Sequence, residues 1–317
     1  MNLPSYFISC DWGTSNFRLR AVDTSTFEVL SEFKSDEGIK KRFQKFNEQE
    51  SFERKEFFLS YLMEQVTKLK LADANKTVIV ASGMMSSSIG MKELPYGNMP
   101  FAFTGFDLLK EMIEFPDAPD LILVSGVKTD NDVMRGEEVQ AIGIANHLPM
   151  TDTGILIQPG THCKHINFKN GRFENFKTFM TGELFEVISQ HSILAATTTH
   201  AVWDDSYEDV FLSGVKKGLS NGLMEHLFAI RANSLLNGVS SIENSFFLSG
   251  LLIGSELSGL VDKNEKVFLG ATGIYSKLYR LALTYFLSQD DLICFNSGDM
   301  ENALFAGQLK VLKTYVS

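Results

Sequence analysis

The chain has 317 residues, of which 44% are hydrophobic and 21% are charged. This composition is ordinary for a globular protein that is long enough to form two domains. The formal net charge is −10, from 29 lysines and arginines against 39 aspartates and glutamates. An acidic chain has no general field that attracts nucleic acid or an anionic membrane, so we expect neither as a partner.

No segment is typical of export or of membrane insertion. The N-terminus lacks a basic region followed by an apolar stretch, and no apolar run reaches about 18 residues. Cys10, Cys163 and Cys294 are far apart and form no C-x-x-C pair, and each lies in or beside an apolar strand-like run, so we interpret them as reduced core thiols. We therefore expect a cytoplasmic protein.

The first half of the chain begins with three predicted strands and continues with alternating helices and strands. A helix is predicted over Ser51–Lys70, because Phe58, Leu62 and Val66 recur at steps of four on one face. The polar stretch 34–50 is expected to be an exposed loop. The predicted strands are Tyr6–Cys10, Asn16–Val22, Phe27–Phe33, Thr77–Ser82 and Leu121–Val124, and the further helices are Phe106–Phe115 and Gly136–His147.

The second half repeats this order around a mostly helical insertion, 206–237. Lys169-Asn170-Gly171 is typical of a hairpin turn, and Thr181 is the expected N-cap of the helix Gly182–Leu194. The predicted strands are Gly154–Pro159, His162–Phe168, Arg172–Thr178, Lys266–Leu269 and Leu292–Phe295, and the further helices are Ser245–Leu260, Ile274–Leu287 and Met300–Thr314.

Both halves therefore have the order βββαβαβα, which indicates an α/β fold with a mixed sheet. Its duplication predicts two ribonuclease-H-like domains of the actin-like ATPase type, 1–148 and 149–317, with a nucleotide cleft between them. The last helix is a candidate to pack back on the first domain. The alternative is one doubly wound domain with a helical cap, but no G-x-G-x-x-G lies between a strand and a helix.

Two Gly-Thr turns, one in each half, are the strongest functional signal. The segments Asp11–Asn16 and Pro159–His162 each join an apolar strand to a returning strand. Glycine lets the backbone approach a ligand, and turn amides with the hydroxyls of Thr14, Ser15 and Thr161 can cradle an anion. The alternative is that both segments are ordinary hairpins without a ligand. Two facing cradles would instead grip a polyphosphate, and Asp11 is a hard ligand suited to hydrated Mg²⁺.

Two further loops are candidates for binding small molecules. Val267–Gly273 runs from a strand through small residues into a helix, so a flat base or ribose can lie on its backbone; an ordinary connecting loop is the alternative. The loop Ala81–Tyr96 is rich in glycine and serine, and its amides at Gly83 and Met84, together with Lys92, are suited to a polyhydroxylated acid. A flexible surface loop is the alternative there.

The segment Asp130–Glu138 leaves a strand and opens a helix. Glu137 and Glu138 in the first turn are either favourable partners of the helix dipole or the source of a general base that takes a proton from a substrate hydroxyl. Arg135 beside them matches a carboxylate bidentately and is suited to hold an anionic substrate.

Together these segments resemble the 2-dehydro-3-deoxygalactonokinase family of the actin-like ATPase superfamily, through nearly the whole chain. Six separate blocks in the expected order carry the resemblance. They are Asp11-Trp12-Gly13-Thr14-Ser15-Asn16, Gly83-Met84, Val133-Met134-Arg135-Gly136-Glu137-Glu138, Pro159-Gly160-Thr161-His162-Cys163-Lys164, Met180-Thr181-Gly182-Glu183-Leu184 and Phe247-Leu248-Ser249-Gly250-Leu251-Leu252-Ile253-Gly254.

The resemblance implies ATP-dependent phosphorylation of 2-dehydro-3-deoxy-D-galactonate at its 6-hydroxyl, a step of galactonate catabolism, with ATP and Mg²⁺ as cofactors. Asp11 would coordinate Mg²⁺. The implied phosphate and nucleoside contacts are Gly13, Thr14, Ser15, Gly160, Thr161, His162, Lys164, Gly270, Ala271, Thr272 and Gly273. The implied sugar-acid contacts are Arg18, Gly83, Met84, Lys92 and Arg135.

Two departures from the family pattern matter. Related sugar kinases have Asp after the glycine that starts the crossover helix, whereas Gly136 is followed here by two glutamates, so we favour Glu137 as the base with Glu138 or Asp132 as rivals. Met91 stands where an aromatic residue is expected, which bears on the sugar acid accepted. The alternatives are a kinase for a related acid such as 2-dehydro-3-deoxygluconate, a phosphatase-type hydrolase, and a non-catalytic sensor. The expected assembly is a homodimer, the commonest among soluble proteins.

Overall fold

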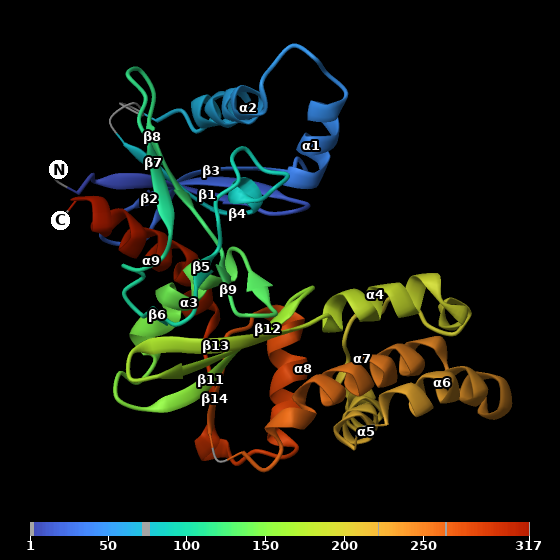
Figure 1. The fold of residues 1–317 in the computed structure, drawn as a ribbon. Coiled ribbons are helices and arrows are strands. Elements are labelled where there is room, and N and C mark those ends of the chain that lie inside the picture. The colour runs from blue at the N-terminus through green and yellow to red at the C-terminus, as the bar shows by residue number, and fades with distance from the viewer. Residues whose placement is uncertain (1–2, 72–76, 221, 264, 317) are drawn as a thin grey trace. The chain divides into compact units, whose positions relative to one another are not determined.

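The computed structural model describes residues 3–71, 77–220, 222–263 and 265–316 (Figure 1). The chain divides into two compact units. Unit 1 comprises Met1–Asp152, Lys169–Asn175 and Glu301–Ser317, and unit 2 comprises Thr153–Phe168 and Phe176–Met300. Within the described residues, no helix is both long and apolar enough to cross a bilayer.

Unit 1 is built on a six-stranded sheet with the order β3-β2-β1-β4-β8-β7. The first three strands form an antiparallel meander, β4 and β8 continue the sheet parallel to β1, and β7 returns antiparallel to β8. A smaller sheet has the order β10-β9-β5. The strand bounds are β1 Tyr6–Trp12, β2 Phe17–Asp23, β3 Val29–Ser35, β4 Val78–Gly83, β5 Gly97–Asn98, β7 Lys110–Ile113, β8 Asp120–Val124, β9 Val127–Lys128 and β10 Val133–Met134.

Helices cover both faces of the large sheet of unit 1 (Figure 1). On one face, α1 (Ile39–Asn47) and α2 (Arg54–Lys68) enclose an apolar core that contains Trp12 and Phe58. On the other lie α3 (Glu137–Ile144) and α9 (Ser297–Val316). The Gln308 carboxamide of α9 donates to the carbonyls of Cys10 and Val80, which ties this helix to the central strands.

Unit 2 contains the second large sheet, whose order is β15-β14-β11-β12-β13, extended at its edge by β6. Pairing with β6 involves Arg172 and Phe173, residues of β13 that group with unit 1. Asn170 and Gly171 both have positive φ, as a two-residue hairpin turn requires, so the predicted turn is confirmed. The bounds are β6 Phe101–Ala102, β11 Thr153–Gln158, β12 Cys163–Lys169, β13 Arg172–Phe179, β14 Lys266–Leu269 and β15 Leu292–Cys294.

The two sheets repeat one plan. In each, the first strand of the meander is central, and the parallel strands that follow are added beside it. This is the ribonuclease-H-like arrangement, and its duplication confirms the predicted α/β fold class.

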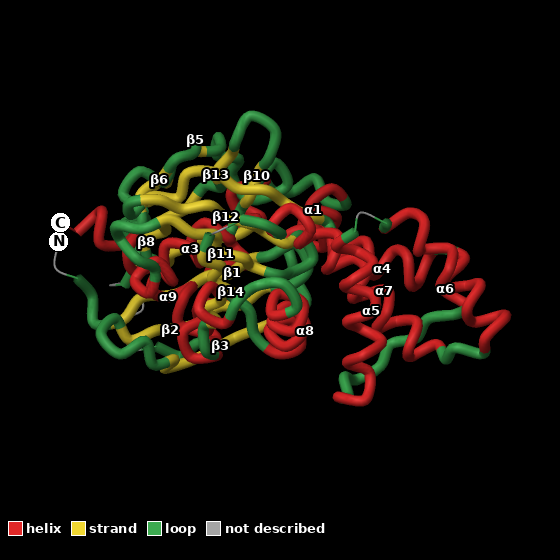
Figure 2. The backbone as a smooth tube through the Cα atoms, turned by 90° about the horizontal axis from the view of Figure 1, so that it is seen from below, coloured by secondary structure: helices red, strands yellow, loops and turns green. Residues whose placement is uncertain are grey.

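The helices of unit 2 fall into two groups. The helix α8 (Gly273–Thr284) lies beside the strands, and α4 to α7 form a helical group at one end of the unit (Figure 2). Within that group α5 and α6 occupy the predicted insertion, and α7 begins with a capping box of Ser240 and Glu243. The bounds are α4 Thr181–His191, α5 Glu208–Leu219, α6 Leu223–Asn237 and α7 Ser241–Leu257.

Four local predictions are wrong. Cys294 is exposed and is not a core thiol, whereas Cys10 and Cys163 are buried as expected. The stretch 34–50 is not a loop throughout but contains α1, whose few apolar residues include Ile39, fully buried at its start. The stretch Phe106–Phe115 is not a helix, because Lys110–Ile113 forms strand β7 and pairs with β8. Phe106, which lies outside this strand, is 73% exposed. Met180, not Thr181, is the N-cap of α4, since the Thr181 hydroxyl is bonded to Glu256 instead.

We expect Gly38→Ala to destabilise unit 1, because Gly38 starts α1 directly against the first Gly-Thr turn. A Cβ atom there would overlap the backbone of Thr14 and Ser15. The free energy of unfolding, measured by urea denaturation, should fall by about 1–3 kcal/mol. The control is Gly259→Ala, where a Cβ meets nothing within 4 Å. Equal stability of the two variants would contradict the packing described here.

Candidate active site

The first Gly-Thr turn is supported from behind by α1. The carbonyls of Gly13 and Thr14 accept hydrogen bonds from the amides of Ile39 (2.9 Å) and Lys40 (3.1 Å). Thr14 and Ser15 are exposed, and within the described residues their amides donate to no backbone carbonyl. The turn therefore directs its acceptors into the protein and leaves donors at its surface, which is what an anion site needs.

Three segments that are distant in the sequence meet at the end of β1. Asp11 pairs with Arg18 of β2 and with Ser82 of β4. A Cβ on Gly83 would lie 3.7 Å from Asp11 Oδ1, and one on Gly136 would lie 3.3 Å from Gly83 Cα. Both glycines have positive φ, 89° and 109°. Glycine at these positions lets the start of α3 approach the Asp11 carboxylate closely.

The two adjacent glutamates at the start of α3 have different environments. The Glu138 side chain is fully buried, and its Oε2 accepts from the amide of Gly136 at 2.7 Å. Burial raises the pKa of Glu138 to about 8, and the neighbouring Glu137 charge acts in the same direction. Glu137 is partly exposed, and its Oε2 accepts from the Arg135 amide at 3.2 Å. Only Glu137 of this pair is therefore placed to meet a substrate as the structure stands.

Burial also raises the pKa of Asp11, while the charges of Arg18 and Arg20 lower it. The described residues contain no cluster of three or more His, Cys, Asp or Glu suited to a metal ion. A single carboxylate fits Mg²⁺ that completes its shell with water and substrate phosphates, which is its usual coordination in proteins.

The guanidinium of Arg135 is held in a fixed position beside the turn at Gly83. It donates to the carbonyl of Ser86 at 2.7 Å and lies over the ring of Tyr96, 4.2 Å from the centroid. Met84 follows Gly83 in a short 3-10 turn, Met84–Ser86. Tyr96 was not singled out by the sequence, because an aromatic residue in a loop has no periodic signal.

Two predicted features of the same loop have other partners. Lys92 forms an ion pair with Glu111 at 2.5 Å, so its charge is already matched within the protein. Met91 belongs to the apolar core of unit 1 and is almost fully buried. It does not form an exposed wall that a sugar acid could contact directly.

The second Gly-Thr turn is supported by α4. The carbonyl of Thr161 accepts from the amide of Glu183 at 3.0 Å, and the His162 ring contacts the Glu183 carboxylate at 2.5 Å. Lys164 is buried, with its ammonium donating to the His162 carbonyl at 3.0 Å. Lys164 therefore stabilises the turn from its buried side, whereas Thr161 and His162 are exposed.

Gln158 occupies in unit 2 the place that Asp11 has in unit 1. Each lies at the end region of its central strand, two residues before the glycine of its turn: Asp11 is the second-last residue of β1 and Gln158 the last of β11. The Gln158 side chain is buried, and neither polar atom of its carboxamide has a hydrogen-bond partner among the described residues. Unit 1 thus offers a carboxylate at this position and unit 2 offers a neutral amide.

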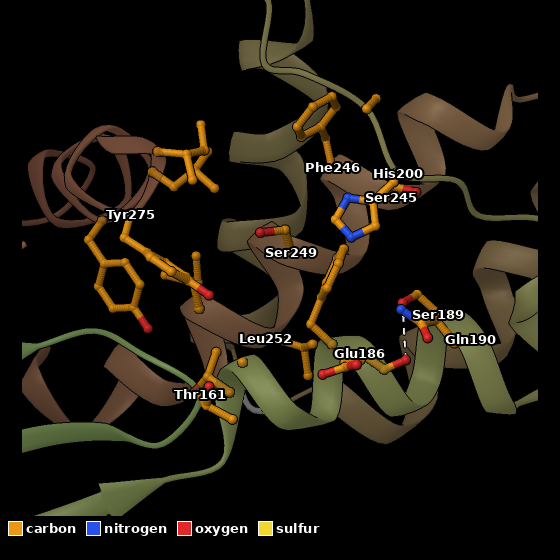
Figure 3. A pocket seen from close by; sticks show the side chains of 18 of the residues that line it. Thr161, Glu186, Ser189, Gln190, His200, Ser245, Phe246, Ser249, Leu252 and Tyr275 are labelled. Atoms are coloured by element: carbon orange, nitrogen blue, oxygen red, sulfur yellow. Dashed lines mark hydrogen bonds between the residues drawn. The ribbon is translucent and has the colours of Figure 1, made fainter. Parts of the chain in front are cut away.

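A pocket of about 400 Å³ opens next to Thr161 in unit 2. Its walls come from α4, α7, α8 and the segment 199–201, and Figure 3 shows Thr161 and Tyr275 toward one end with His200 and Gln190 toward the other. The predicted nucleoside segment Gly270–Gly273 adjoins it, because Ile274 and Tyr275 directly follow that segment and line the pocket. Parts of α4 and α7 lie in two of the blocks that carry the family resemblance, but no role in a pocket was assigned to them, because only tertiary packing brings the two helices together.

Comparison with known proteins identifies the family. The profile of the 2-keto-3-deoxy-galactonokinase family matches residues 11–307. The chain belongs to this family. It is 32% identical over 293 residues to a probable 2-dehydro-3-deoxygalactonokinase of Rhizobium meliloti, covering 89% of this chain and 90% of the relative. It is 30% identical over 265 residues to the 2-dehydro-3-deoxygalactonokinase of Escherichia coli, covering 82% of each chain.

The fold is also similar to that of a solved structure. A crystal structure from Sinorhizobium meliloti, described as a candidate 2-dehydro-3-deoxygalactonokinase, superposes with a TM-score of 0.81 at 30% identity. The match covers 97% of this chain and 96% of that one. The resemblance inferred from six sequence blocks is therefore confirmed.

The buried Glu138 should make the stability of this kinase-family protein depend on pH. Its pKa lies near 8 in the folded protein against a usual value of 4.5. At a pH between these two pKa values, unfolding therefore releases a proton from Glu138. The contribution of Glu138 to the free energy of unfolding is fully present below pH 4.5 and is lost as pH rises through 8.

Glu138→Gln should remove this contribution. We expect the free energy of unfolding of the wild type, relative to that of the variant, to fall steadily between pH 4.5 and pH 8. Urea denaturation of both proteins across that range measures the difference. A difference that is constant with pH would contradict the raised pKa.

Proposed function

We propose that this protein transfers the γ-phosphoryl group of ATP to the 6-hydroxyl of 2-dehydro-3-deoxy-D-galactonate. The observation that carries the proposal is the meeting of Asp11, Gly83 and the Gly136–Glu137 corner beside an anion-binding turn. Phosphoryl transfer needs positioning and charge neutralisation more than covalent chemistry, and this arrangement supplies both. Membership of the 2-keto-3-deoxy-galactonokinase family supports the choice of sugar acid.

The phosphates and the nucleoside of ATP are assigned to separate segments of the chain. The phosphates are assigned to Gly13, Thr14 and Ser15 of the first turn and to Gly160, Thr161 and His162 of the second. The nucleoside is assigned to the pocket beside Thr161, whose volume of about 400 Å³ lies in the range of small-molecule sites. The small-residue segment Gly270–Gly273 would form the edge of that pocket.

The sugar acid is assigned to the region of Gly83, Met84 and Arg135 in unit 1. The fixed guanidinium of Arg135 pairs with the substrate carboxylate, and Arg18 adds positive charge nearby, whereas the charge of Lys92 is already matched by Glu111. Glu137 accepts the proton of the attacking hydroxyl as general base. Glu138 is assigned a supporting role, because it is buried and holds the Gly136 amide.

Asp11 is assigned to Mg²⁺, which neutralises charge on the transferring phosphate when bound. Every other contribution comes from the chain itself. The turns orient the phosphates, Arg135 orients the acceptor, and Glu137 holds the proton. A cytoplasmic location and a homodimer stay expectations from the sequence.

The test is a coupled ADP-release assay with Mg-ATP against four sugar acids. These are 2-dehydro-3-deoxygalactonate, 2-dehydro-3-deoxygluconate, galactonate and gluconate. We expect turnover that strongly favours the first. Turnover of the gluco epimer instead would keep the kinase and change its substrate. ATP binding without turnover of any acid would overturn the proposal in favour of a sensor.

We expect Glu137→Gln to lower kcat by about 10²–10⁴-fold, the usual contribution of a positioned base. The matched control is Glu138→Gln, one residue further along α3, which should lower kcat much less. Steady-state kinetics with saturating ATP and sugar acid make the comparison. If Glu138→Gln causes the large loss and Glu137→Gln does not, the two roles are reversed.

Gly160→Ala should weaken ATP binding without harming the fold. A Cβ atom at this position comes no closer than 4.0 Å to the protein, and its backbone does not have positive φ. The methyl group would nevertheless occupy the space that a phosphate oxygen needs, raising the ATP dissociation constant roughly 10- to 100-fold. Isothermal titration measures this. Unchanged affinity would remove Gly160 from the phosphate site.

A further inference from the structure

A buried carboxylate lies beneath the second Gly-Thr turn. Glu256, on α7, is only 4% exposed. It accepts hydrogen bonds from the Tyr279 hydroxyl of α8 at 2.6 Å and from the Thr181 hydroxyl at the start of α4. Its other oxygen contacts His165 Nε2 of β12 at 2.8 Å. One side chain thus connects four elements of unit 2.

Two of these partners also form part of the pocket wall. Thr181 and Tyr279 both line the pocket assigned to the nucleoside. Their hydroxyl groups cannot turn freely, because each has the Glu256 carboxylate as its acceptor. The position of Glu256 therefore fixes the polar part of that wall.

A second connection runs from Glu256 to the turn itself. The Tyr279 hydroxyl lies 3.0 Å from Cys163 Sγ, and this thiol contacts both the amide and the carbonyl of Gly160. A continuous chain of hydrogen bonds thus joins Glu256, Tyr279, Cys163 and Gly160. Such networks hold their members more firmly than isolated pairs do, because each bond polarises the next.

The same turn is also joined to Glu256 through α4. Thr181 precedes Gly182, which packs on the Gly160 carbonyl, and Glu183, whose amide donates to Thr161. By holding Thr181, Glu256 holds the end of α4 on which the turn rests. The Glu256 carboxylate is thus connected to the turn in two separate ways, through Tyr279 with Cys163 and through Thr181 at the start of α4.

We propose that Glu256 is a positioning residue for the nucleotide. It fixes the orientation of the Thr181 and Tyr279 hydroxyl groups in the pocket and the position of the Gly160–Thr161 turn. It does not contact ATP itself. This inference rests on the proposed ATP site in unit 2. It assigns the geometry of both the phosphate turn and the nucleoside pocket to one buried charge.

The test compares Glu256→Gln with Leu257→Ala, its neighbour on α7. Gln keeps the shape of Glu but loses the charge that accepts from three donors. Leu257 is a fully buried core residue that takes no part in the network, so its truncation lowers stability alone. Dissociation constants for ATP, KM values for ATP and sugar acid, and kcat are measured below the unfolding temperature of both variants.

We expect Glu256→Gln to raise the dissociation constant and KM for ATP about tenfold or more. The KM for the sugar acid and kcat should change little, and Leu257→Ala should leave all four quantities near wild type. Equal ATP affinity of wild type and Glu256→Gln, or an equal loss in Leu257→Ala, overturns the inference. If the wild type itself binds no ATP, the proposed function fails and the inference with it.

Tyr279→Phe provides a second variant if Glu256→Gln does not fold. It keeps the ring and removes the hydroxyl, which breaks the link between Glu256 and Cys163 and takes one polar group from the pocket wall. We expect weaker ATP binding in this variant as well. ATP binding equal to wild type in Tyr279→Phe would exclude the route through Cys163.

Discussion

The close approach of Gly136 to Gly83 is the constraint on which the site in unit 1 depends. Side chains at these positions would separate the start of α3 from the end of β4, and with it Glu137 from Asp11. Both backbones also have positive φ, which favours glycine. Backbone packing at these glycines therefore brings together the segments that carry the carboxylate assigned to the proton and the one assigned to the metal.

The two units share one sheet topology but differ in the polar side chain that precedes the Gly-Thr turn. Two residues before the turn glycine, the central strand of unit 1 carries a carboxylate, Asp11, whereas that of unit 2 carries the carboxamide of Gln158. A polyphosphate needs cationic or neutral surroundings, so a single carboxylate that recruits a metal is tolerable where a second would add repulsion. The turns also differ in their support: α1 holds the first by its amides, and a buried network centred on Glu256 holds the second.

Most of the elements with strong patterns were predictable. Apolar strands such as β1 and β11, and the amphipathic α2, follow from local periodicity. The helix α1 was missed because its stabilising contacts are with a distant turn, and β7 was mistaken for a helix because spacing of apolar residues by three and four is not decisive in ten residues. Candidate site residues on motifs could be named from the sequence, but the contact of Tyr96 with Arg135, the burial of Gln158 and the pocket between α4 and α7 depend on tertiary packing.

The central claim is that each of the two Gly-Thr turns binds phosphate groups of ATP. Hydrogen–deuterium exchange of the backbone amides, with and without Mg-ATP and in the absence of sugar acid, tests it directly. The account predicts that ATP slows exchange at residues 13–16 and at residues 160–162 together, with the same dependence on ATP concentration. Protection of one turn while the other exchanges as in the free protein would contradict it.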